Sequence, residues 1–180
     1  MCSLFDVLEE QAKQRRIEER KYAIGVDLGA TNVRVALGDE EGKLIQKREE
    51  KTEVTLGQDA LSQQIARMIE LVVEDECAIE DLRGIGIGSV GPLDPKRGAI
   101  LKAANIPFDF VPLVHPLMRT FSLPVYLVND CTTAAIGEKT FGAGRHVDNL
   151  VYITISTGIG GGAYVDNHLL MGKDNNAAEI

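Results

Sequence analysis

The sequence predicts an α/β protein whose helices pack on a core of strands. Strand-like and helix-like apolar patterns follow one another in the order β-β-β-α-β-α-β-α, which is typical of layered α/β domains. Hydrophobic residues make up 44% and charged residues 26% of the 180 residues, the balance of an ordinary folded protein. A chain of this length forms one domain, or one domain and part of another.

The first 21 residues stand apart from this pattern. They carry an apolar stripe at helical spacing and then a highly charged run, which together predict a helix that caps the domain or a solvated arm. The stripe consists of Leu4, Phe5, Leu8 and Ala12.

Residues 22–140 contain the first α/β unit. Three strands are predicted over 22–28, 33–37 and 43–51, joined by a turn at 29–32 and a hairpin loop at 38–42, so they form an antiparallel meander. A crossover helix is predicted after them, because residues 59–76 place their apolar side chains on one helical face.

The second part of this unit is predicted to run from strand to helix twice. The expected elements are a strand at 83–90, a loop with two prolines at 91–95, a helical region interrupted by proline at 107–121, a strand at 125–128 and a helix at 130–140 that ends at Gly142.

Residues 141–180 are predicted to begin a second, incomplete unit. Residues 150–155 and 158–165 are expected to form a hairpin with its turn at Asp166 and Asn167, and residues 171–180 a loop.

Composition excludes several classes of protein. The net charge of −8 has the wrong sign for neutralising nucleic acid phosphates. Three cysteines without CxxC spacing predict neither a disulfide framework nor a zinc knuckle. Neither a signal peptide nor a run of 18 apolar residues is found, so we expect a cytoplasmic protein that does not enter membranes.

Two glycine clusters match the sequence of the dinucleotide-binding fingerprint but lack the helix that must follow it. Residues 86–91 fit G-x-G-x-x-G and residues 158–163 fit its alanine variant. The fingerprint must open a helix at the pyrophosphate, but prolines follow the first cluster and a strand-like pattern follows the second. A P-loop is excluded as well, because Gly-Lys-Ser and Gly-Lys-Thr do not occur.

The turn after the first strand is the best candidate for an anion site. In Asp27-Leu-Gly-Ala-Thr-Asn32, Gly29 allows the backbone to approach a ligand, and Thr31 and Asn32 add side-chain donors. Asp27, near the end of an apolar strand, could hold a hydrated Mg²⁺. An ordinary β-turn with a capping aspartate explains the same residues equally well.

Two further segments carry candidate groups. Residues 156–162, Ser-Thr-Gly-Ile-Gly-Gly-Gly, offer hydroxyls and bare amides suited to anionic oxygens, or they form merely a tight hairpin. Asp130 follows a buried strand, where open α/β sheets bind ligands, although an aspartate at that place is more often a helix N-cap. Glu179 means little by itself, and the scattered histidines predict no metal site.

Together these motifs resemble the ROK family (repressors, open reading frames and kinases). The resemblance runs from residue 22 to 180 and rests on segments 24–34, 90–94, 128–130, 141–144, 156–162 and 177–180. It implies the ribonuclease-H-like fold shared by actin, hexokinase and the Hsp70 ATPase, here the first lobe and the start of the second. It also implies a glucokinase-like enzyme that phosphorylates glucose or a related hexose with ATP and Mg²⁺.

The resemblance implies a role for each candidate residue. Asp130 would be the general base, and Asn129, Glu179, Asn105 and Gly91 would contact the sugar with it. Gly29, Thr31 and Asn32 would face the ATP phosphates from one lobe, and Thr157, Gly158 and Gly160 from the other. Asp27 would hold Mg²⁺ through water.

The sequence departs from the family at its end. Family members continue past Glu179-Ile180 with Gly-His and a cysteine-rich loop, so structural Zn²⁺ is expected only in that absent part. We therefore expect a piece of a longer, homo-oligomeric enzyme that is incomplete alone, or a naturally short chain. The alternatives are an N-acetylmannosamine-type kinase, a sugar-binding regulator of the same family, whose winged helix does not fit into 21 residues, and an actin-like ATPase.

Overall fold

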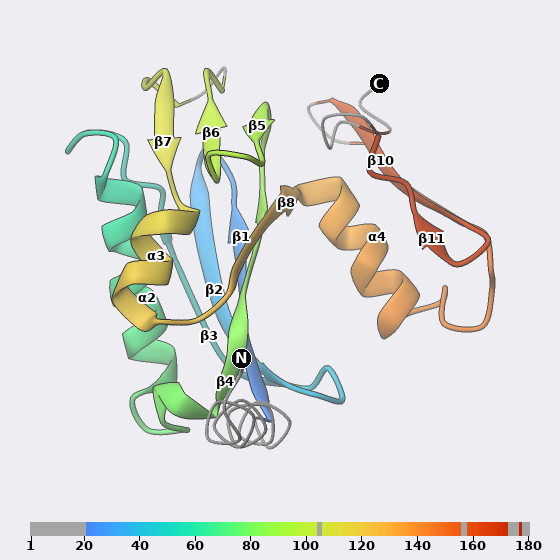
Figure 1. Cartoon of the computed structure of the whole chain (residues 1–180), viewed down its shortest axis with the longest axis horizontal. Coiled ribbons are helices and arrows are strands. Elements are labelled where there is room, and N and C mark those ends of the chain that lie inside the picture. Colours follow the sequence, from blue (N-terminus) through green and yellow to red (C-terminus); the bar gives the residue numbers. More distant parts are fainter. Residues whose placement is uncertain (1–20, 104–105, 156–157, 173–176, 178–180) are drawn as a thin grey trace, which may run out of the picture.

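The computed structural model describes residues 21–103, 106–155, 158–172 and 177 and is built around a five-stranded sheet (Figure 1). The strand order is β3-β2-β1-β4-β8. The strands are β1 (Tyr22–Leu28), β2 (Asn32–Asp39), β3 (Leu44–Lys51), β4 (Leu82–Ser89) and β8 (Val125–Asn129). The first three form the predicted antiparallel meander, and β1, β4 and β8 run parallel.

Two helices cover one face of this sheet. They are α2 (Ala60–Val73), which follows the predicted meander in the chain, and α3 (Val114–Phe121), which precedes β8. Alternation along β1 directs Ile24, Val26 and Leu28 toward them, and the apolar stripe of α2 meets these side chains in the core. A short 3₁₀ helix, Ile79–Asp81, leads from α2 into β4.

The opposite face of the sheet is covered only in part. Helix α4 (Asp130–Thr140) packs over the ends of β4 and β8, on the side away from α2 and α3 (Figure 1). Its bounds agree with the predicted helix. Beyond it, no described element covers the same sheet face, and Tyr126 is 66% exposed there.

A second, three-stranded sheet corrects two predictions. It consists of β5 (Leu93–Asp94), β6 (Ala99–Leu101) and β7 (Phe110–Pro112), in that order. The predicted loop at 91–95 therefore contains a strand, and the predicted helical region at 107–121 is helical only from Val114. Pro112 lies in an edge strand, where a residue without an N–H is tolerated.

A third sheet follows α4 and consists of β9 (Leu150–Ile155), β10 (Ile159–Val165) and β11 (His168–Leu169). The predicted turn at Asp166 and Asn167 connects β10 to β11 rather than β9 to β10. Both residues have positive φ, 49° and 62°, as a type I′ hairpin turn requires. The predicted N-terminal helix or arm and most of the loop at 171–180 lie outside the described residues.

In the part of the chain that the structure describes, none of the helices combines the length and the apolar content needed to cross a membrane.

Candidate active site

The candidate residues of the first lobe meet at one edge of the main sheet. The parallel register places Leu28 of β1 beside Ser89 of β4, and Ser89 beside Asn129 of β8. The β1–β2 turn, the segment after β4 and the start of α4 therefore follow neighbouring strand ends. This carboxyl edge is where open α/β sheets bind their ligands.

The β1–β2 turn is tightly held. The Gly29 amide donates to the Asn32 carbonyl at 3.0 Å, which closes the turn. A Cβ on Gly29 would come within 3.1 Å of that same carbonyl oxygen, so the close approach favours glycine. Thr31 is exposed and Asn32 half-buried, so both side chains reach the surface of the edge.

Thr52, which directly follows β3, holds this turn by hydrogen bonds to its backbone. The sequence motifs did not single it out. Its hydroxyl donates to the Gly29 carbonyl at 2.7 Å, and its amide donates to the Thr31 carbonyl at 3.0 Å. The side chain is buried, with 8% exposed. The only local signal is an uncharged hydroxyl residue directly after a strand of charged ones.

Asp27 is paired with Arg34, a neighbour across the hairpin that sequence patterns also missed. Arg34 Nη1 lies 2.7 Å from Asp27 Oδ2, and Arg34 Nε lies 3.1 Å from Glu49 Oε2 on β3. The two hydrogen bonds, first to Glu49 and then to Asp27, raise the pKa of Arg34 above its usual value. The hydrogen bond from Arg34 likewise lowers the pKa of Glu49.

Asn129 and Asp130 form the start of α4. The Asn129 side-chain oxygen accepts from the amides of Cys131 at 2.9 Å and Thr132 at 3.3 Å, so Asn129 is the N-cap. The sequence left this role open for Asp130. One oxygen of the half-buried Asp130 carboxylate, Oδ1, accepts from the Cys131 amide at 2.8 Å.

The second hairpin lies against the same helix. A Cβ on Gly160 would come within 2.7 Å of Cys131 Sγ, and one on Gly162 within 2.7 Å of the Ala135 Cβ. Close packing on α4 therefore accounts for Gly160 and Gly162 of β10. Gly158 has open space around it.

Of the four other predicted site residues, the structure describes only Gly91. Gly91 lies just beyond β4, next to the Val90 amide, which donates to the Leu28 carbonyl at 3.3 Å, so it belongs to the carboxyl edge. Asn105, Thr157 and Glu179 lie outside the described residues.

A groove of about 530 Å³ lies on the sheet face beside α4. Small and apolar residues of the strands line it, together with residues of α4 and the Asp27–Arg34 pair. The lining residues include Gly25, Ala36, Gly86, Tyr126, Val128 and Ile136.

A divalent metal ion would find one carboxylate here rather than a ligand cage. The described residues contain no group of three or more His, Cys, Asp or Glu side chains placed to hold a metal. Asp27 contributes a single carboxylate, one oxygen of which is bound to Arg34. This fits Mg²⁺, which usually binds through one or two carboxylates together with phosphates and water.

Known proteins resemble this chain over most of its length. A glucokinase of Pyrobaculum calidifontis is 41% identical over 160 residues, which are 89% of this chain and 48% of that protein. A xylose repressor of Caldicellulosiruptor bescii is 32% identical over 162 residues, 87% of this chain and 40% of the repressor. The chain thus spans about half the length, or less, of these relatives.

The fold is shared with solved structures of such proteins. A ROK family glucokinase from Streptomyces griseus, solved with glucose and AMPPNP, superposes with a TM-score of 0.75 at 34% identity, over 88% of this chain and 49% of that one. The likeness identifies the fold as the actin-like, ribonuclease-H-like type, with the described residues forming its first lobe and the start of the second. The ROK family model matches residues 23–180. The chain therefore belongs to the ROK family.

Proposed function

We propose that this chain forms the first half of a cytoplasmic sugar kinase that transfers the γ-phosphate of ATP to a hydroxyl of glucose or a related hexose. The observation that carries the proposal is the meeting of the β1–β2 turn and the Asn129-Asp130 pair at one edge of the sheet. Phosphoryl transfer needs a phosphate cradle and a base for the attacking hydroxyl close together. The named glucokinase relative supports this choice of reaction.

Asp130 is the proposed general base. With Oδ1 bound to the Cys131 amide, the carboxylate has a fixed orientation, and Oδ2 has no partner among the described residues. Oδ2 would accept the proton of the sugar hydroxyl while that oxygen bonds to the γ-phosphorus and the bond from phosphorus to the ADP oxygen breaks. Asn129, Gly91, Asn105 and Glu179 are proposed to hold the sugar.

The phosphates would lie between two turns. Gly29, Thr31 and Asn32 would approach them from the first lobe, and Thr157, Gly158 and Gly160 from the second. Asp27 would help to hold Mg²⁺, which neutralises phosphate charge when bound. Because little covalent chemistry falls to the protein, positioning of these groups would supply most of the rate enhancement.

The decisive experiment compares Asp130→Asn with the wild type in a form of the protein that carries both lobes. Asparagine keeps the size and a carbonyl oxygen but cannot accept the proton, so we expect kcat to fall by about 10²- to 10⁴-fold. Sugar affinity, measured by calorimetry, should change little. Undiminished turnover in the variant would remove Asp130 from the mechanism.

A sugar-sensing regulator is the second candidate, because a relative at 32% identity is named a xylose repressor. The two functions differ in two readouts. A regulator binds sugar without transferring phosphate and binds operator DNA with strong salt dependence, whereas a kinase forms ADP in step with sugar phosphate.

A further inference from the structure

Thr52 joins two peptide groups of the β1–β2 turn to the end of β3. Its hydroxyl donates to the Gly29 carbonyl at 2.7 Å and its amide to the Thr31 carbonyl at 3.0 Å. Both carbonyl oxygens therefore point back toward Thr52. Thr52 itself is buried, with 8% of the residue exposed.

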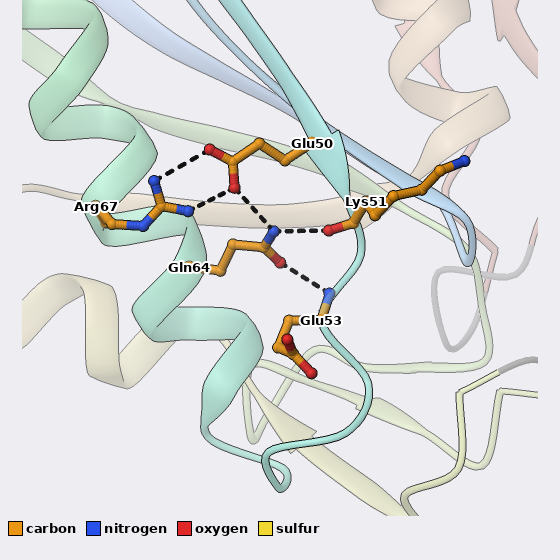
Figure 2. A network of polar contacts seen from close by, with 5 residues as sticks. All are labelled: Glu50, Lys51, Glu53, Gln64 and Arg67. Atoms are coloured by element: carbon orange, nitrogen blue, oxygen red, sulfur yellow. Dashed lines mark hydrogen bonds and ion pairs between the residues drawn. The ribbon is translucent and has the colours of Figure 1, made fainter.

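Thr52 is itself held by α2 through its neighbours in the chain. Gln64 Nε2 donates to the Lys51 carbonyl at 2.7 Å, and Gln64 Oε1 accepts from the Glu53 amide at 3.0 Å (Figure 2). Arg67, one turn further along α2, is paired with Glu50 in the same view. Helix α2 thus fixes the backbone on both sides of Thr52.

The bond to the Gly29 carbonyl also sets the direction of an amide. The peptide group is planar and trans, so the C=O of Gly29 and the N–H of Ala30 point in opposite directions. Holding the carbonyl toward Thr52 directs the Ala30 N–H to the other side of the turn. No described residue accepts a hydrogen bond from the Ala30 amide.

We propose that Thr52 is a positioning residue that aims the Ala30 amide at the phosphates of ATP. The inference rests on the proposed function, because that function places phosphate at this turn. Preorganised amides bind anionic oxygens without reorganisation when the ligand arrives. Thr52 touches no ligand and acts only through the orientation of the turn.

The test is Thr52→Val compared with Thr52→Ser, measured in the full chain with both lobes. Valine has the shape of threonine without the donor, so we expect the Kd for ATP to rise about 3- to 10-fold, the loss of one hydrogen bond. Serine keeps the donor and should restore ATP affinity to within about twofold. The Kd for the sugar should remain unchanged in both variants.

Thr120→Val is the matched control. Thr120 Oγ1 donates to the Pro116 carbonyl at 3.1 Å within α3, far along the chain from the turn. This variant loses the same type of bond at a place without a proposed role. We expect its ATP and sugar affinities to equal those of the wild type.

Each outcome decides the inference. Unchanged ATP affinity in Thr52→Val, equal weakening of ATP and sugar, failure of serine to restore affinity, or absence of ATP binding in the wild type would overturn it. If Thr52→Val does not fold, Gln64→Leu, which frees the backbone around Thr52, must weaken ATP alone. Wild-type ATP binding without phosphate transfer would overturn the kinase proposal, while the comparison of valine with serine would still decide the role of Thr52.

Discussion

Arg34 Nη1 lies 2.7 Å from Asp27 Oδ2, across the hairpin that carries the candidate phosphate turn. The two residues face each other in the β1–β2 register, on the open face of the sheet. Glu49 on β3 binds the same guanidinium from the other side at 3.1 Å. Three adjacent strands thus contribute to one charged cluster beside the proposed nucleotide site.

Arg34→Met should raise the pKa of Glu49 toward its ordinary value, because the hydrogen bond from Arg34 lowers it. A folded-state pKa below the unfolded value stabilises the chain above the unfolded pKa, and this contribution is lost as the pH falls through the folded pKa. The effect on stability is expected to be small, since both side chains are over 40% exposed. Carboxyl NMR titration measures the shift.

Glu50 provides the internal control for that titration. Its pKa is lowered chiefly by a hydrogen bond from Arg67, not from Arg34. Arg34→Met should leave the Glu50 titration unchanged. A shift of both glutamates would indicate a general distortion of β3 instead.

Asn129→Ala should destabilise the chain by about 1 kcal/mol, because the N-cap of α4 loses its acceptor. Asn129→Asp keeps an acceptor and adds a favourable charge at the helix N-terminus, so stability should be retained. Urea unfolding measures both. Equal destabilisation by alanine and aspartate would contradict the capping role.

Gly162→Ala should destabilise the chain by about 1 to 3 kcal/mol, the usual cost of overpacking. The added Cβ would lie 2.7 Å from the Ala135 Cβ and 2.9 Å from the Cys131 carbonyl. Gly137→Ala within α4 is the control, because open space surrounds it, and it should stabilise the helix by about 0.5 to 1 kcal/mol. Thermal unfolding in the wild-type background would show opposite shifts in Tm.

The 180-residue chain should self-associate through β9. Val151, Ile153 and Ile155 share one strand face and are 67%, 58% and 80% exposed. Ile153→Lys should lower the average mass in sedimentation velocity experiments at high protein concentration. Leu56→Lys, at an isolated exposed leucine in a loop, should not. Equal masses for wild type and Ile153→Lys would refute the prediction.

Sequence patterns predict the long elements well. The alternation along β1 and β2 and the apolar stripe of α2 are clear, and the start of β1 and both ends of α4 agree with the structure to the residue. The sheet of β5, β6 and β7 is missed because strands of two or three residues are too short for periodicity. Its segments contain several prolines and glycines, which mimic loop signals.

The candidate site can likewise be predicted from the sequence only in part. The strand-end positions of Asp27 and Asp130 can be inferred from buried strands that precede them. The partners Arg34 and Thr52 depend on hairpin register and on tertiary contact, which local patterns do not carry. The packing of Gly160 on Cys131 joins residues 29 positions apart and has no local signal at all.

The close packing of α4 has a consequence for mutational tolerance. A Cβ on Gly88 would come within 3.0 Å of Thr133 on one side of the helix, and Gly160 and Gly162 meet it on the other. A side chain at these glycines crowds the helix that carries Asp130, or the Thr133 and Cys131 side chains on it. In a saturation mutagenesis screen for activity, all three positions should therefore score as intolerant as an active-site residue. Protein abundance measured in the same screen would separate them, falling at the glycines and not at Asp130.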